Sequence, residues 1–135
     1  MPFYIRAKTY FRYAQEQLGF AEEEKDPARI LKFAKEAVFQ ACRALWAIVQ
    51  IEAPKEKPSF EKILSELDKA CEPWLAREIK NAVKRIEELG KAPSQEGAKE
   101  ALELARFVVR RTRDVLEPIV GPSERVERHR KLFVR

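Results

Sequence analysis

The chain has few of the residues that most metal and cofactor sites need. Its 135 residues include one histidine, His129, and two cysteines, Cys42 and Cys71. A di-iron bundle needs a Glu-x-x-His pair on each of two helices, and a structural zinc site needs about four Cys and His ligands. The four glycines do not cluster, so neither a phosphate-binding loop nor a dinucleotide fingerprint is present. We therefore expect no metal and no cofactor.

Long apolar runs are absent as well. The longest, Ala44 to Val49, is far too short to cross a bilayer. The chain does not open with a basic segment followed by an apolar one, so we expect a cytoplasmic protein without a secretory signal. Neither cysteine lies in a C-x-x-C pair, and both are expected to be buried thiols. Asparagine occurs once and threonine twice among many Lys, Arg and Glu residues, a composition that resembles the thermophilic pattern.

The sequence does contain strong helical periodicity. Apolar residues recur at spacings of three and four from Tyr4 to about Glu24, as on one face of a helix. The same pattern, with Pro, Ser or Asp start signals, predicts helices at about 27–51, shortly after 59, at 73–90 and from 94 to about 116. Pro118, Gly121 and Pro122 are expected to end the last one. The sequence therefore predicts an all-α, up-and-down bundle of four to five helices over residues 1–121, followed by a basic C-terminal tail over residues 122–135.

The second predicted helix, from Pro27 to about Ile51, is mostly apolar, and its few polar residues trace one narrow stripe. A helix of this kind must be covered on most sides. It is either the long central helix of the bundle or also part of a dimer interface. A stripe of small residues lets a neighbouring helix approach closely; its members are Ala34, Ala37, Ala41 and Ala44.

Positive charge is concentrated at the C-terminal end of the chain. The net charge is +5, and residues 1–105 hold as many acidic as basic residues, so the whole excess lies in residues 106–135. Arg106, Arg110 and Arg113 share one helix face because they are four and three residues apart. Such a face attracts phosphates or an acidic partner, whereas the alternative is ordinary salt bridging to glutamates of neighbouring helices. The candidate anion-binding residues are Arg106, Arg110, Arg111, Arg113, Arg128, Arg130 and Lys131.

One pair of residues suggests acid–base chemistry. Arg125 and His129 lie four residues apart in the tail, and on a helix they would share a face. An arginine could then stabilise a phosphorane while the histidine moves a proton. The alternative is a solvated basic tail. These two residues are the only catalytic candidates, and we expect a non-catalytic protein.

The segment from Phe33 to Leu45 resembles the second helix of HEPN domains. That helix shows spaced alanines, an aromatic-Gln-Ala step, here Phe39-Gln40-Ala41, and then a small-Leu pair, here Ala44-Leu45. The helix order also resembles the family, over roughly residues 4–117. Members of this family are helical bundles and often dimers. Some are partners of small nucleotidyltransferases, and others are metal-independent ribonucleases with an R-x4-6-H motif.

The sequence departs from the ribonuclease motif. Arg125 and His129 are separated by three residues, one too few, and lie beyond the last predicted helix of the bundle. Ser59-Phe60 stands where relatives often have a histidine at the start of the short helix. The resemblance therefore implies a non-catalytic member of the family. Together with the basic face, it leads us to expect a homodimeric binding domain that presents this face to RNA, a nucleotide or a nucleotidyltransferase-type partner. The alternatives are a metal-independent ribonuclease that uses Arg125 and His129, and a purely structural dimerisation domain.

Overall fold

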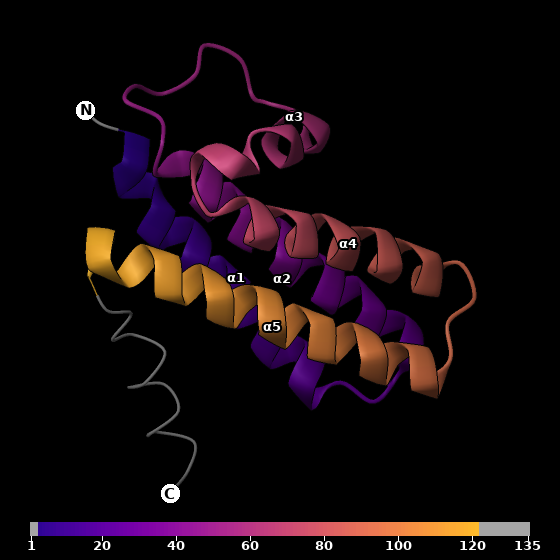
Figure 1. Cartoon of the computed structure of the whole chain (residues 1–135). Coiled ribbons are helices and arrows are strands. Elements are labelled where there is room, and N and C mark those ends of the chain that lie inside the picture. Colours follow the sequence, from indigo (N-terminus) through magenta and orange to yellow (C-terminus); the bar gives the residue numbers. More distant parts are fainter. Residues whose placement is uncertain (1–2, 122–135) are drawn as a thin grey trace, which may run out of the picture.

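The chain folds into a bundle of helices (Figure 1). A computed structural model describes residues 3–121, in which every regular element is helical, so the all-α prediction is confirmed. The predicted tail, residues 122–135, lies outside the described residues, as do residues 1 and 2. The elements are the 3-10 helix η1 (Phe3–Ile5), α1 (Arg6–Glu23), α2 (Pro27–Ala47), α3 (Phe60–Ser65), the 3-10 helix η2 (Leu67–Lys69), α4 (Pro73–Gly90) and α5 (Gln95–Val120).

Four long helices run alternately up and down, and the short α3 lies near the end of the bundle where α2 finishes and α4 begins (Figure 1). The helix α2 is central, because it contacts α1, α5, α4 and α3. Twelve of its 21 residues are buried. This arrangement confirms α2 as the long central helix. None of the helices over residues 3–121 combines the length and hydropathy that a bilayer-spanning segment needs.

Small residues are buried on both α1 and α2, which form the most extensive helix–helix contact of residues 3–121. The four alanines of the predicted stripe on α2 have no exposed surface, and neither do Ala7 and Ala14 of α1. The distance between two packed helices depends on the side chains at their contact, so these alanines allow a close approach. Larger side chains such as Leu45, Ile79 and Val108, each fully buried, fill the rest of the core.

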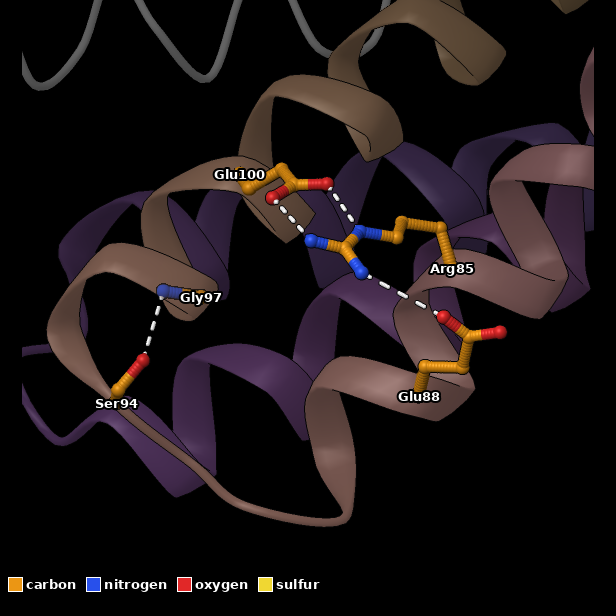
Figure 2. A network of polar contacts seen from close by, with 5 residues as sticks. All are labelled: Arg85, Glu88, Ser94, Gly97 and Glu100. Carbon is orange, nitrogen blue, oxygen red and sulfur yellow. Dashed lines mark hydrogen bonds and ion pairs between the residues drawn. The ribbon is translucent and has the colours of Figure 1, made fainter.

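Two serine caps confirm predicted helix starts. Ser59 Oγ accepts a hydrogen bond from the backbone N–H of Lys62 at 3.2 Å, and Ser94 Oγ accepts one from Gly97 at 3.0 Å (Figure 2). Each bond satisfies an amide that has no partner within its helix. Both caps therefore set where α3 and α5 begin.

The predicted cap at Asp26 is wrong in its chemistry. Asp26 precedes Pro27 at the start of α2, but its side chain makes no capping hydrogen bond. Instead, Glu24 Oε1 accepts the backbone N–H groups of Asp26 at 3.3 Å and Lys25 at 3.0 Å. These two bonds, that from Asp26 foremost, lower the pKa of Glu24. A glutamate in the turn therefore binds amides that precede α2.

The contact between α4 and α5 includes an arginine fork (Figure 2). Arg85 donates to Glu100 through Nε at 2.5 Å and through Nη2 at 3.0 Å, and its Nη1 lies 3.5 Å from Glu88 Oε2. The pKa of Glu100 is lowered because Arg85 hydrogen-bonds to its charged form. The two-bond geometry fixes the angle of the guanidinium as well as its distance.

Two predicted helix ends differ from the structure. The second helix ends at Ala47 rather than Ile51, because Val49 and Gln50 donate to the carbonyls three residues back, which tightens the last turn. The last helix continues through Pro118 to Val120. Proline lacks the N–H that would bond four residues back, yet the helix continues beyond it, and Gly121 N still donates to Glu117 O at 3.0 Å. Gly121 then ends the helix with φ +86°, a conformation that favours glycine.

Candidate anion-binding surface

The predicted basic face lies on α5, beside α1. Arg106 Nη2 of α5 is 3.2 Å from Glu22 Oε2 near the end of α1. At the opposite end of this contact, Lys8 Nζ lies 3.7 Å from the position that a Cβ on Gly121 would occupy. The two helices are therefore antiparallel (Figure 1). Because Arg106 reaches Glu22, α1 borders the face of α5 that carries Arg106 and, by helical spacing, Arg110 and Arg113.

Two of the predicted arginines already have acidic partners. Arg106 donates to Glu22 through both Nε and Nη2, as the salt-bridging alternative predicts for this residue. Arg111 Nη1 donates to Asp114 Oδ2 at 3.2 Å, and its guanidinium lies 5.8 Å from the centroid of the Phe107 ring. Because each residue turns the helix by about 100°, Arg111 also points away from the side of Arg110. Arg106 and Arg111 are therefore less available to bind an anion.

Arg110 and Arg113 differ from them. Within residues 3–121, neither has a carboxylate within 4.0 Å. Arg110 is exposed and Arg113 is half-buried, and they are three residues apart on the side of α5 that borders α1. Their charge is therefore open to a ligand.

The neighbouring half of α1 adds to the positive potential. Residues 6–16 hold three basic residues, Arg6, Lys8 and Arg12, against one acid, Glu16. The antiparallel packing brings this half beside residues 106–120 of α5, which hold four arginines and two acidic residues, Asp114 and Glu117. This contribution was missed at the level of sequence, since α1 counted as a whole holds three basic residues and three acidic ones, Glu16, Glu22 and Glu23. Only knowledge of the helix pairing could have separated them.

The remaining candidates lie outside the described residues. They are Arg125, Arg128, His129, Arg130 and Lys131. Their anion-binding and catalytic roles stay predictions. Within residues 3–121 no group of three or more His, Cys, Asp and Glu side chains is placed to hold a metal ion.

A shallow depression between α2 and α4 has different chemistry. Val38, Phe39, Val83 and Ile86 line it, with Lys35 at its rim. The depression is open and apolar, and the ring of Phe39 is engaged on another side by the stacked ring of Phe60, 3.7 Å away between centroids. It therefore carries none of the anion-binding residues.

The described part of the chain is a small all-helical domain. No protein-family model, no curated protein and no solved structure matches the chain at a significant level.

Proposed function

We propose that this protein is a non-catalytic helical binding domain that takes a phosphate-bearing polyanion, of the class of RNA, on the α1–α5 face. The observation that carries the proposal is the contrast along one helix. Arg106 and Arg111 are neutralised by Glu22 and Asp114, whereas Arg110 and Arg113 have no acidic partner among residues 3–121. Two exposed or half-exposed guanidinium groups on one side of a helix are suited to contacts with phosphate oxygens.

Electrostatics favours a polyanion over a small neutral ligand. The C-terminal half of α5 and the N-terminal half of α1 are both basic, and they lie side by side. A surface of one sign attracts a phosphate chain over several contacts, each of which releases a counterion. Residues 122–135 hold five basic residues and two acidic ones, so they extend the positive charge along the sequence.

The resemblance to HEPN domains is consistent with this proposal. It rests on the apolar pattern around Phe39-Gln40-Ala41 and on the order of helices, and it implies a dimer and, in some members, a nucleotidyltransferase as partner. Arg125 and His129 do not match the ribonuclease motif. We therefore place the protein among binding domains, with RNA itself as the ligand to be tested first.

The test is fluorescence anisotropy of a labelled single-stranded RNA with the full chain, at about 50 and 200 mM salt, a range over which phosphate contacts weaken strongly. The R110E/R113E variant should bind more weakly. Its slope of log affinity against log salt should be shallower by about 1.4, since two phosphate contacts are lost. The R77E/K84E variant is the matched control. It makes the same change of net charge at two exposed residues of α4 that have no ion pair within residues 3–121. Its RNA affinity should fall less than that of R110E/R113E and stay close to that of the unaltered chain.

Equal loss of binding in both variants would show a response to net charge alone and would overturn the proposal. Absence of binding at either salt concentration would also overturn it and would direct attention to acidic protein partners. The same samples are run on a gel. If the gel shows shortened RNA, and if His129→Ala abolishes this cleavage, the ribonuclease alternative replaces the binding-domain proposal.

A further inference from the structure

A second surface of α1 is regular, exposed and chemically distinct from the anion-binding surface. Six residues at alternating spacings of three and four form a stripe on the side of α1 away from its buried alanines; they are Arg6, Thr9, Tyr13, Glu16, Phe20 and Glu23. This spacing is the one by which a helix presents a seam to another helix. Five of the six are exposed and Thr9 is half-buried. We refer to these six residues as the α1 seam.

The middle of the α1 seam is aromatic. Tyr13 is 40% exposed and Phe20 is 49% exposed, high values for large apolar side chains. Phe20 touches the bundle at one edge, where its ring lies 5.7 Å from that of Phe33 between centroids. The guanidinium of Arg12 lies 5.3 Å from the Tyr13 ring centroid. Much of both rings therefore remains in contact with solvent.

The two ends of the α1 seam carry opposite charges. Arg6 stands at its first position and Glu23 at its last, and neither has an ion-pair partner within residues 3–121. The two glutamates on either side of Glu23 are already paired, since Glu22 contacts Arg106 and Glu24 contacts Arg29. Arg6 and Glu23 are thus left as the open charges of the seam.

We infer that the α1 seam binds the α1 seam of a second copy of this chain, with the two helices antiparallel. In that orientation Arg6 of each copy meets Glu23 of the other, so a single pairing is made twice around a two-fold axis. The same register places Tyr13 of one copy against Glu16 of the other, where a phenol O–H can donate to a carboxylate. It also places Phe20 against Thr9, which removes the ring from water. A parallel pairing would instead set Arg6 against Arg6 and Glu23 against Glu23.

The charges of the seam favour a second copy over a polyanion or a membrane surface. Arg12 pairs with Glu16 at 3.9 Å, so Arg6 and Arg12 balance Glu16 and Glu23, and the seam offers no excess positive charge to phosphates. A helix that lies on a membrane has a wide apolar face with lysine and arginine on the other, which the two aromatics of this seam do not provide.

This inference specifies the dimer that the proposed function includes, but it does not depend on RNA binding. The α1 seam and the Arg110–Arg113 pair lie on different sides of the bundle, since α5 contacts α1 on the side of Lys8 and Glu22. Pairing along the seam therefore leaves the Arg110–Arg113 pair of each copy open, so that the dimer presents two such pairs.

The test measures molar mass by sedimentation equilibrium of the full chain over a wide range of concentrations. The unaltered chain should be a dimer. The dimer dissociation constant of the R6E variant, and that of the E23R variant, should each be at least about tenfold higher, because two attractive contacts become repulsive in each variant. An equal mixture of the R6E chain and the E23R chain should recover the unaltered affinity as a mixed dimer, because both contacts are again between opposite charges. The doubly changed R6E/E23R chain should recover it as well.

Two further variants separate the seam from general surface effects. Tyr13→Glu places a charge in the middle of the seam and should give a monomer that keeps its helical circular dichroism. Trp74→Glu changes an aromatic residue of α4 that is 46% exposed and outside the seam, and it should leave the dimer intact. A monomeric unaltered chain at every concentration overturns the inference, as does a mixture of R6E and E23R chains that fails to pair. Neither result bears on RNA binding, which R110E/R113E tests separately without a change of molar mass.

Discussion

The indole Nε1 of Trp46 donates a hydrogen bond to Oε2 of Glu66 at 2.8 Å, which joins the last turn of α2 to the residue between α3 and η2. Trp46 is buried, and Glu66 is half-buried. This bond is the largest of the influences that lower the pKa of Glu66 below its ordinary value of 4.5, and Lys69 at 3.4 Å acts in the same direction. A polar contact thus holds the short helices against the centre of the bundle.

Replacement of Glu66 by glutamine should reduce stability at neutral pH by about 1 kcal/mol, because a neutral amide oxygen accepts the indole N–H less strongly than a carboxylate. Since the folded pKa is depressed, the contribution of Glu66 is fully present above its ordinary value and is lost as the pH falls through the folded pKa. Urea denaturation at pH 7 and below pH 4.5 measures both effects. The E61Q variant, at an exposed glutamate of α3, is the control. If the difference in unfolding free energy between E66Q and the unaltered chain stays constant with pH, the charged Glu66 carboxylate does not stabilise the fold as assigned.

Thr112 is the reverse case, a buried polar group without a partner. Its side chain is fully buried in α5, and its hydroxyl oxygen has no hydrogen-bond partner among the described residues. Thr112→Val keeps the branched shape and removes the hydroxyl, so it should stabilise the fold by about 1 kcal/mol. This corresponds to a rise of about 4 °C in the thermal midpoint. Thr112→Ser keeps the hydroxyl and removes a methyl group, and it should destabilise. If Thr112→Val lowers the midpoint, the hydroxyl is bonded in solution.

Gly97 is needed for a packing reason. Gly97 lies beside the Ser94 side chain that caps α5 (Figure 2). A Cβ at this position would lie 3.0 Å from Ser94 Oγ and 3.3 Å from Leu89 Cδ2, closer than about nine in ten real contacts of a Cβ. Gly97→Ala should therefore destabilise by about 1 kcal/mol, although alanine favours helices. Gly90, at the end of α4, has no atom near its own Cβ position, and Gly90→Ala should stabilise by about 0.5 kcal/mol.

The Gly97 and Ser94 effects should not add. Ser94→Ala removes both the cap and one of the two atoms that a new Cβ would meet, so Ser94→Ala with Gly97→Ala should cost less than the sum of the single changes. Chemical denaturation of the four chains gives this coupling. Strict additivity would show that Leu89, and not the capping hydroxyl, is the obstacle.

The two thiols should differ in reactivity. Burial raises the pKa of Cys42, which has no exposed surface, and burial also raises the pKa of the half-buried Cys71. The thiolate is the reactive form, so an aromatic disulfide reagent at pH 8 should label Cys71 slowly and Cys42 only after unfolding. The C71S variant isolates the signal of Cys42. Rapid labelling of C71S under native conditions would contradict the burial of Cys42.

Glu22 should weaken anion binding by the α1–α5 face, because it forms an ion pair with Arg106. Glu22→Gln removes the opposing charge and leaves a third open arginine beside Arg110 and Arg113. RNA affinity should rise a few-fold, with a salt slope steeper by about 0.7. Glu87→Gln makes the same change of charge at an exposed position of α4 and serves as the control. An equal rise in both variants would indicate that Arg106 gains no contact of its own.

Helix positions were predictable because they depend on residues close in sequence. Apolar spacings of three and four, proline at the first helical position and serine caps are enough to locate four long helices and the short α3. The ends of α2 and α5 were less predictable. The apolar residues Ile48, Val49 and Ile51 continue the pattern although the helix ends at Ala47. The last helix continues through Pro118 to Val120, although proline removes one backbone donor.

The candidate site was predictable only in part, because sequence patterns report relations between residues that are close in the chain. The sequence by itself determined that the chain is all-helical, that α2 is apolar enough to be central, and that Arg106, Arg110 and Arg113 share a side of their helix, since each follows from local composition and the helical period. Tertiary structure decided which of those charges remain open. Glu22 is 84 residues from Arg106 in sequence and 3.2 Å from it in space, and no periodicity within either helix encodes that pairing. It arises because α1 and α5 pack antiparallel beside α2, which sets an acidic turn against one arginine and leaves two others facing solvent.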